Sequence, residues 1–318
     1  MDLERGAAAN ESVSVSCPAC GGRKLKGWGP LPVYTPDFLG RNRTSGVKPG
    51  SLYECADCTL RFRAPQPSQA ELMAYYQGLN VVECWQHGSR SVWRDIKEGL
   101  ASIPQPSVLD VGCFRGDMLD YLGSEFERFG VEPSKEAARE AEKRGIKIIA
   151  DSIESLQIVE PRFGAITLID VAEHLPAPLD SFRALSQLLL PGGKLFVFTG
   201  NTDALSWRLA GIDYYYSAMP EHVVFMGPAW FRWVAPRINC EIALIRPMRY
   251  RSSSWREWLD EGLKNILYTA YQRLRRTRVV PSFVLDLPLV RRVGQWQGCW
   301  WTSAKDHALV VLTRRGSS

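Results

Sequence analysis

The chain has 318 residues, of which 45% are hydrophobic and 23% charged, so an intrinsically disordered chain is excluded and a full α/β core with a small extra module is possible. The first residues show no signal-peptide pattern, and no apolar run reaches the roughly 18 residues of a membrane span. The formal net charge is +5, but the segment 246–292 holds 11 Lys and Arg against 4 Asp and Glu. These properties predict a cytoplasmic globular protein with one strongly basic segment.

The N-terminal part of the chain differs in composition from the rest. Residues 1–16 are mainly small and polar, and we expect a flexible tail there. The segment 17–63 is rich in Gly and Pro and has only short β-like stretches, at Ser51–Glu54 and Thr59–Arg63. A segment of this size buries too little apolar surface to fold alone. We therefore expect a bound metal to stabilise it.

Four of the eight cysteines form two Cys-x-x-Cys pairs, Cys17/Cys20 and Cys55/Cys58. Two such pairs present four thiolates in the tetrahedral arrangement that Zn²⁺ accepts. Four protein ligands leave no position for a water molecule, so the pattern predicts a structural rather than a catalytic Zn²⁺. The alternative is two redox-active or fortuitous pairs in a reducing compartment.

A helical connector is expected at residues 64–106. Ser68 is placed to cap one helix, and a second helical pattern covers Ser91–Ala101. Two prolines then mark a boundary, after which the main domain occupies residues 107–318.

Strand and helix patterns alternate from Ser107 onward, which is typical of a mostly parallel sheet covered by helices. The segment Ala165–Ile169 is a continuous apolar run, as expected of a buried parallel strand. The predicted strands are Val108–Val111, Phe126–Glu132, Lys147–Ala150, Ala165–Ile169, Lys194–Thr199, Glu241–Ile245 and Ala308–Thr313.

Helix signals lie between these strands. Ser134 is placed to cap a helix that Gly145 terminates, and the run Pro191-Gly192-Gly193 is expected to break another helix before the next strand. An insertion at about 247–306 separates the last two strands. Its apolar residues recur at helical spacing, which fits either core packing or a face that rests on an anionic membrane.

A glycine-rich loop, Asp110 to Gly116, follows the first strand of the main domain. The dinucleotide fingerprint G-x-G-x-x-G is absent, so the loop indicates a close backbone approach to a ligand rather than a phosphate cradle. Glu132 ends the second strand, where an acid accepts ribose hydroxyls in nucleotide folds. Asp151 ends the third strand and is placed to accept from an adenine amino group.

Five segments in this order, VLDVGCFRGDML, VEPS, ADSIESL, FGAITLIDVAEHL and LLLPGGKLFVFTGN, resemble the successive motifs of class I S-adenosylmethionine-dependent methyltransferases. The resemblance covers about residues 107–201 and implies a Rossmann-like, seven-stranded, mostly parallel α/β sheet with an antiparallel last strand. One departure is Phe114, which stands where the family usually has a glycine. The cofactor contacts that follow from the resemblance are Asp110, Gly112, Cys113, Phe114, Gly116, Glu132, Asp151, Ser152 and Asp170.

The segments CPAC and CADCTLRFRAPQPSQAELMAYY, together with the central motifs, are similar to methyltransferases with an N-terminal zinc ribbon. That subgroup often tailors bacterial polysaccharides, sugars or natural products, which implies a small-molecule or glycan acceptor. The segment MPEHVVFM resembles the Glu-His stretch in the active site of sugar C-methyltransferases, and it maps onto Glu221 and His222. O-methylation is the favoured reaction, and sugar C-methylation remains open.

Two histidines are candidates for proton transfer. His222 lies beyond the fifth strand, where loops border the carboxyl ends of the sheet, so we take it as the candidate base. A packing role for His222 is an equal alternative. His174 follows the fourth strand, and in the family that position more often shapes the pocket than performs chemistry.

Two other functions compete with methyl transfer. A nicotinamide-dependent sugar-modifying enzyme would usually carry Tyr-x-x-x-Lys, and no tyrosine of this chain has a lysine four positions later. A non-catalytic zinc-ribbon protein that binds nucleic acid would use the basic segment, but that segment has no recognition helix or RNA-binding motif. We do not expect nucleic acid as a partner. A peripheral position at the inner face of a membrane is open, and so is the oligomeric state.

Overall fold

A computed structural model of the chain describes residues 15–32, 48–68, 70–72, 91–158, 162–250, 253–277, 281–294, 301 and 303–316. The predicted tail lies outside these residues except for positions 15 and 16. From residue 73 onward, the helix expected after Ser68 lies outside the described residues. At its start, the Ser68 hydroxyl accepts the Glu71 N–H at 3.2 Å, as a capping residue does.

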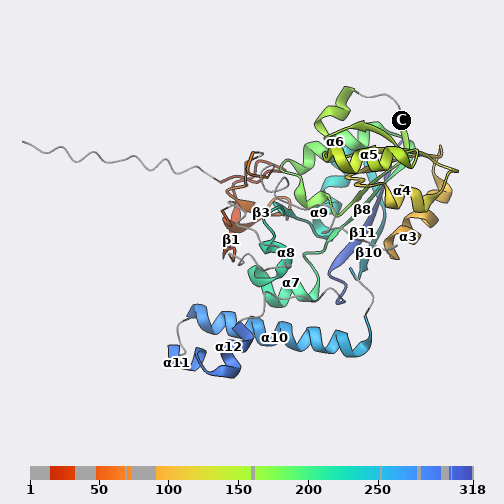
Figure 1. The fold of residues 1–318 in the computed structure, drawn as a ribbon. Helices are drawn as coiled ribbons and strands as arrows, with labels where there is room; N and C mark the ends of the chain where they lie inside the picture. Colours follow the sequence, from red (N-terminus) through yellow and green to blue (C-terminus); the bar gives the residue numbers. More distant parts are fainter. Residues whose placement is uncertain are drawn as a thin grey trace, which may run out of the picture.

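A seven-stranded sheet carries the main domain, with the order β10-β11-β8-β7-β4-β5-β6 (Figure 1). The strand β11 runs antiparallel to both of its neighbours, and β8, β7, β4, β5 and β6 run parallel. This is the Rossmann-like sheet with an antiparallel edge that the sequence predicts. The strands are β4 (Ser107–Val111), β5 (Glu127–Val131), β6 (Lys147–Ala150), β7 (Phe163–Ile169), β8 (Leu189–Gly200), β10 (Cys240–Met248) and β11 (His307–Arg314).

Alternate residues of the strands pack against helices on the two faces of the sheet. On one face Val108 and Phe196 contact a cluster formed by α3 (Ser91–Gly99), α4 (Asp117–Leu122) and α5 (Lys135–Lys143). On the other face Leu109 and Leu195 pack with α6 (Pro178–Leu188) and α9 (Pro228–Val234). Ser134 caps α5 as predicted, because its hydroxyl accepts the Ala137 N–H.

The run Pro191-Gly192-Gly193 lies inside β8 rather than between a helix and a strand. The strand begins at Leu189, which pairs with Phe163, and the register then shifts so that Ala165 pairs with Lys194. Gly192 has a φ of 78°, a conformation that glycine adopts without steric cost, so the chain turns within the strand and continues. The prediction that this run lies between the helix and the strand was therefore wrong, because the strand begins before it.

A second, four-stranded sheet has the order β1-β2-β3-β9. Its first three strands, β1 (Leu25–Pro30), β2 (Ser51–Cys55) and β3 (Arg61–Ala64), come from the cysteine-bearing segment. Its fourth strand, β9 (Val224–Phe225), comes from the main domain and pairs antiparallel with β3. The N-terminal module is thereby joined to the main domain by backbone hydrogen bonds.

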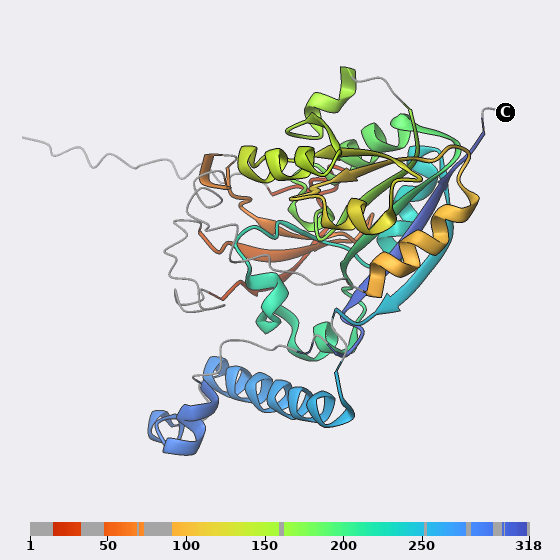
Figure 2. The same cartoon turned by 45° about the vertical axis from the view of Figure 1, so that its right-hand side comes forward.

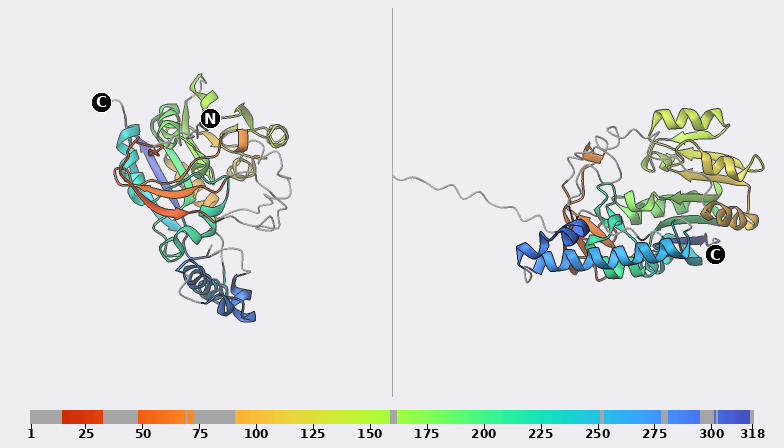
Figure 3. Two further views of the ribbon diagram at one scale, coloured as in Figure 1. Left: turned by 90° about the vertical axis from the view of Figure 1, so that its left-hand side faces the viewer. Right: turned by 60° about the horizontal axis from the view of Figure 1, so that its bottom comes forward.

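Three further helices lie between β10 and β11: α10 (Trp255–Thr277), α11 (Ser282–Leu285) and α12 (Pro288–Gly294). The long helix α10 runs along one end of the molecule, with the two sheets on one side of it (Figures 2 and 3). Two short helices, α7 (Leu205–Ala210) and α8 (Tyr215–Ala218), link β8 to β9. Among the described residues, no helix combines the length and the hydropathy needed to cross a bilayer.

Candidate active site

The glycine-rich loop after β4 is held tightly against its neighbours. Gly112 and Gly116 have φ of 72° and 79°, which favours glycine. A Cβ at Gly116 would lie 2.0 Å from the Ile146 side chain, and one at Gly112 would lie 2.7 Å from Val171. The Gly112 N–H donates to the Val131 carbonyl at 2.8 Å. The loop therefore brings its backbone to the carboxyl edge of the sheet in one fixed path.

Glu132 connects this loop to the end of β5. One carboxylate oxygen accepts the Phe114 N–H at 2.8 Å, and the other accepts the Ser134 N–H at 2.8 Å. Phe114 has a φ of 50°, the left-handed conformation that the family's glycine would adopt freely. The Glu132 bond thus holds in place the residue that departs from the family pattern. Burial raises the pKa of Glu132, and its bonds to Ser134 and Phe114 oppose that rise.

Two residues of the loop point into the protein. Asp110 is buried and accepts the Thr167 hydroxyl at 2.6 Å. Burial raises the pKa of Asp110 to about 7, against the lowering effect of Thr167. The Cys113 side chain is also buried, close to Gly130 of β5, and burial raises the pKa of its thiol. Cys113 therefore contributes to the loop through its backbone, and its side chain is not a reactive thiolate.

The remaining predicted cofactor residues follow the ends of β6 and β7. Asp151 comes directly after β6, is exposed, and accepts the Ser155 hydroxyl at 3.3 Å. Ser152 is the next residue, and its hydroxyl lies 3.2 Å from that of Ser155. Asp170 comes directly after β7 with a φ of 55°, and its N–H donates to Phe198 at 2.9 Å. The structure thus brings the predicted carboxylates to one edge of the sheet.

The two candidate histidines form a contacting pair. The rings of His174 and His222 have centroids 5.0 Å apart at an angle of 79°. Nδ1 of His174 lies 3.0 Å from the Glu221 carbonyl, and Nδ1 of His222 lies 2.8 Å from the Tyr216 carbonyl. A carbonyl oxygen only accepts, so each Nδ1 carries a proton and, in a neutral ring, Nε2 carries the lone pair. Burial, and then the neighbouring His174, lowers the pKa of His222 well below 6.5.

Glu173 lies beside the histidine pair and is almost fully buried. Its carboxylate accepts the Tyr216 hydroxyl at 2.6 Å and the Thr199 hydroxyl at 2.8 Å. Burial raises the pKa of Glu173, while His174 opposes that rise. The ring of Tyr216 also contacts His222, at 4.2 Å between centroids. The sequence does not predict the bond between Glu173 and Tyr216, because that bond joins α8 to the loop after β7.

Glu221 is 2% exposed, and its Oε2 has no hydrogen-bond partner among the described residues. A buried carboxylate oxygen without a donor costs free energy, so such atoms usually await a water, an ion or a ligand. This residue directly precedes His222. The predicted Glu-His stretch therefore combines a fixed imidazole with a carboxylate oxygen that has no donor within the described part of the chain.

A second buried histidine, His307, has no sequence pattern that points to it. His307 begins β11, and its Nε2 lies 3.9 Å from Asp170 while its Nδ1 lies 3.1 Å from Asp306. Burial disfavours the charged ring, but Asp306, Asp170 and Glu173 outweigh that effect and raise the pKa of His307. Asp306 also accepts the Tyr214 hydroxyl at 2.9 Å. No motif marks these residues, since they come together only when β11 pairs with β8.

Arg63 of β3 supports the loop that bears the histidine. It is 1% exposed, and its guanidinium donates to the carbonyls of Ser217 at 3.1 Å and Met219 at 2.8 Å. The Arg63 N–H also donates to the Val223 carbonyl at 2.9 Å. The N-terminal module thus holds the chain on both sides of Glu221 and His222.

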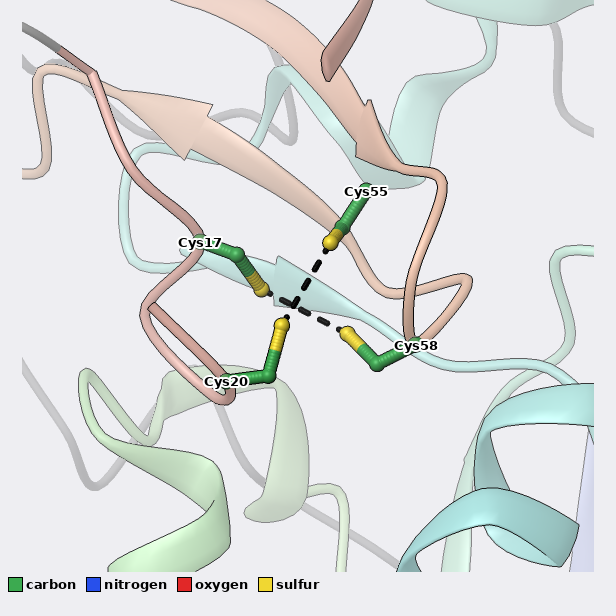
Figure 4. A group of neighbouring side chains, drawn as sticks. All are labelled: Cys17, Cys20, Cys55 and Cys58. Carbon is green, nitrogen blue, oxygen red and sulfur yellow. Dashed lines mark hydrogen bonds between the residues drawn. The ribbon is translucent and has the colours of Figure 1, made fainter. Parts of the chain in front are cut away.

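The four paired cysteines of the N-terminal module converge on one point (Figure 4). Sγ atoms of Cys17 and Cys58 lie 3.4 Å apart, and those of Cys20 and Cys55 lie 3.5 Å apart. All four sulfurs lie within 4.8 Å of one another, and none is in a disulfide. Tetrahedral thiolates about 2.3 Å from Zn²⁺ have sulfurs at comparable separations. The donor set therefore fits Zn²⁺.

Comparison with known proteins places these features in a family. A family model described as "Methyltransferase domain" matches residues 53–244. The ubiquinone biosynthesis O-methyltransferase of Serratia proteamaculans is 30% identical over 148 residues, which cover 42% of this chain and 61% of the relative. The enzyme of the same name from Yersinia pestis is 30% identical over 129 residues, which cover 37% of this chain and 53% of the relative. The chain thus spans less than two thirds of the length of either relative.

Solved structures with a similar fold are more distant in sequence. A putative methyltransferase from Bacillus halodurans is 13% identical, with a TM-score of 0.49 over 71% of this chain and 100% of the other. Coclaurine N-methyltransferase, bound to N-methylheliamine and SAH, is 13% identical, with a TM-score of 0.46 over 72% of this chain and 76% of the other. Because the family model matches more than half of the chain, the chain belongs to the S-adenosylmethionine-dependent methyltransferases.

Proposed function

We propose that this protein transfers a methyl group from S-adenosylmethionine to a hydroxyl of a small-molecule or glycan acceptor, with His222 as the general base. The observation that carries the proposal is the contact between His174 and the buried His222, in which each Nδ1 faces a backbone carbonyl. This arrangement fixes the tautomer and leaves the neutral His222 ring ready to accept a proton at Nε2.

The residues at the carboxyl edge of the sheet fit the proposed cofactor. Glu132 accepts one backbone N–H at each oxygen, and each oxygen keeps capacity for a further donor such as a ribose hydroxyl. Asp151 is exposed one strand away, which suits an adenine amino group. Backbone of Gly112 to Gly116 would lie along the methionine end.

S-adenosylmethionine supplies a methyl group on a sulfonium, which is already a good leaving group. The protein therefore has to align the acceptor and take up its proton. In the proposed step the acceptor oxygen bonds to the methyl carbon while the carbon–sulfur bond breaks and its electron pair stays on sulfur. The hydroxyl proton passes to Nε2 of His222, and Glu221 accepts a hydrogen bond from a second polar group of the acceptor.

Two observations support a hydroxyl acceptor. The curated relatives at 30% identity are named O-methyltransferases. The buried Oε2 of Glu221, which no described residue donates to, suits an acceptor with neighbouring hydroxyls, such as a catechol or a sugar. A sugar carbon acceptor is the second candidate, because the Glu221-His222 pair matches the stretch found in sugar C-methyltransferases.

We also propose that residues 17–63 form a zinc ribbon whose role is structural. Four thiolates would fill the tetrahedral coordination of Zn²⁺ and leave no open position, so the metal would take no part in methyl transfer. Its contribution would be to hold β2 and β3, which place Arg63 against the His222 loop.

The experiment compares wild-type protein with His222→Asn. Release of S-adenosylhomocysteine is measured with two sets of probes, alkylated catechols and nucleotide-linked sugars. We expect turnover with one set, and a loss of about 10²- to 10⁴-fold in His222→Asn, with cofactor affinity within about twofold of wild type. Unchanged turnover in the variant would assign His222 to packing. No turnover with either set, despite cofactor binding, would contradict the hydroxyl acceptor classes named here.

A further inference from the structure

Exposed large apolar side chains are concentrated on the helices between β10 and β11. Of the twelve such side chains among the described residues, nine lie on α10 or in the α11–α12 segment. Trp255 and Phe283 are each 68% exposed, a degree that few aromatic residues of a globular surface reach. The α10 members are Trp255, Trp258, Leu259, Leu263, Ile266, Leu267 and Leu274.

The exposed residues of α10 form one stripe. Trp255, Leu259, Leu263 and Ile266 follow each other at spacings of three or four residues, which places them on the same face of a helix. The adjoining face is buried on the protein through Asn265, Tyr268 and Thr269, and at its border with the stripe a Cβ at Gly262 would come within 2.8 Å of the Trp301 ring. The helix therefore already packs on the protein through its buried face, and the apolar stripe is not needed for that packing.

The helices that bear the stripe are also rich in basic side chains. The second half of α10 and the last turn of α12 carry arginines and no acid. The exposed ones are Arg273, Arg275, Arg276, Arg291 and Arg292, of which Arg276 pairs with Asp213. The acids near the start of α10 are engaged within the protein. Glu257 accepts the Ser254 hydroxyl at 3.0 Å, Asp260 pairs with Lys264 at 2.6 Å, and Glu261 accepts the Ser303 hydroxyl at 2.6 Å.

We propose that α10, together with α11 and α12, rests on an anionic lipid surface. The helix has 23 residues, about 35 Å, and lies along one end of the molecule, so the stripe can contact a flat surface while both sheets stay on the other side (Figures 2 and 3). Exposed Trp and Phe suit the boundary between headgroups and acyl chains. Arginines beside the stripe would bind the anionic headgroups.

A second copy of this chain is the competing occupant of the stripe. The segment 246–292 holds 11 basic against 4 acidic residues, so two copies would bring two strongly positive segments together. An anionic surface complements the same charge. The charge balance therefore favours lipid over self-association.

The test is co-sedimentation of the full chain with vesicles of phosphatidylcholine, with and without phosphatidylglycerol. We expect binding to the vesicles that contain phosphatidylglycerol, at least about tenfold tighter than to the neutral ones and weakened by salt. Leu263→Glu/Ile266→Glu should weaken binding about tenfold or more, since charge on the stripe opposes its burial. Arg291→Glu/Arg292→Glu should weaken binding to anionic vesicles by a similar factor.

Matched control variants introduce or reverse the same number of charges outside this region. Tyr121→Glu/Leu244→Glu alters two exposed apolar residues outside this region, and Lys135→Glu/Arg139→Glu reverses two charges on α5. Both controls should bind within about twofold of wild type, and circular dichroism checks that every variant is folded. Equal binding to neutral vesicles, or no binding to either kind, would overturn the proposal. Light scattering gives a further contradicting result. The proposal fails if the protein binds no vesicle and instead forms a dimer that Leu263→Glu/Ile266→Glu dissociates.

Discussion

The cofactor edge and the histidine pair are built in opposite ways. At the cofactor edge, each functional residue lies in or next to a loop that directly follows a strand, as Gly112 follows β4 and Glu132 follows β5. The histidine pair instead depends on segments far apart in the chain. Arg63 lies more than 150 residues from the carbonyls that it holds, and Tyr216 lies 43 residues from Glu173.

This difference teaches that one half of the site is a property of the sheet and the other half is a property of its surroundings. Parallel strands of a Rossmann-like sheet end at one edge, so their loops meet wherever such a sheet forms. The histidine pair requires β9 to pair with β3 and α8 to pack against the loop after β7. Perturbing the N-terminal module should therefore harm the histidine pair and spare the cofactor edge.

The largest expected effect is that of removing the proposed Zn²⁺. Structural Zn²⁺ contributes on the order of 10 kcal/mol to the folding of small modules, so Cys58→Ser or a chelator should unfold the module. Because β3 pairs with β9, hydrogen exchange should then rise in residues 214–225, while the loop 110–116 stays protected. Metal analysis and hydrogen-exchange mass spectrometry measure both effects.

Cys240→Ser is the control for this experiment, since Cys240 is buried but lies outside the four-cysteine group. It should keep one Zn²⁺ per chain. A Cys58→Ser protein with full zinc content and unchanged protection would refute the structural role of the group.

The next largest effect is a pH dependence of stability that comes from Asp110 at the cofactor edge. Because the folded-state pKa of Asp110 is raised to about 7 from 3.8, its contribution to stability is present at acid pH and lost as pH rises toward 7. Asp110→Asn should therefore match wild type near pH 4 and exceed it by roughly 4 kcal/mol at pH 8, at 1.36 kcal/mol per pKa unit. Urea unfolding at several pH values measures this; a pH-independent difference would show that Asp110 is ionised throughout.

A smaller effect should follow from Arg63→Met, which removes two hydrogen bonds to the loop before Glu221. Buried carbonyls that lose a charged donor cost about 2 kcal/mol, and the loop should lose its position. We expect lower stability in urea and a reduced kcat with unchanged cofactor affinity. Arg23→Met on the exposed surface is the control. Reduced cofactor affinity with an unaffected kcat would reverse the assignment of the module to the histidine side.

The smallest effect is a displaced pH profile. A folded-state pKa of His222 below 6.5 keeps its imidazole neutral in mildly acid solution, and the stability that this gives is present above pH 6.5 and lost as pH falls below it. The acid limb of kcat should therefore lie below pH 6.5. An acid limb above pH 7 would exclude a neutral His222 as the base.

Much of the fold could be predicted because the decisive signals are local. The apolar run at 165–169, the Ser134 cap and the glycine loop each specify an element by residues within a few positions. The antiparallel pairing of the last two predicted strands was also confirmed. Most strand ends lie within three residues of the prediction, as with β10, which extends to Met248 because edge pairing continues beyond the apolar core. The exception is β8, which begins at Leu189, five residues before its predicted start.

The rest could not be predicted because it depends on contacts between distant segments. Glu173 is a central acceptor in the histidine cluster only because Tyr216 and Thr199 reach it in the folded chain. His307 is buried between two acids because β11 enters the sheet beside β8. The turn inside β8 likewise follows from its pairing with β7, which no local pattern specifies.

The central claim is that the carboxyl edge of the seven-stranded sheet binds S-adenosylmethionine through Glu132. Isothermal titration of the zinc-loaded protein tests it most directly, with Glu132→Gln as the variant and Asp180→Asn, an exposed acid of α6, as the control. We predict binding by wild type and control, and at least about tenfold weaker binding by Glu132→Gln. The absence of binding to the folded wild-type protein would contradict the account, as would equal affinities for all three proteins.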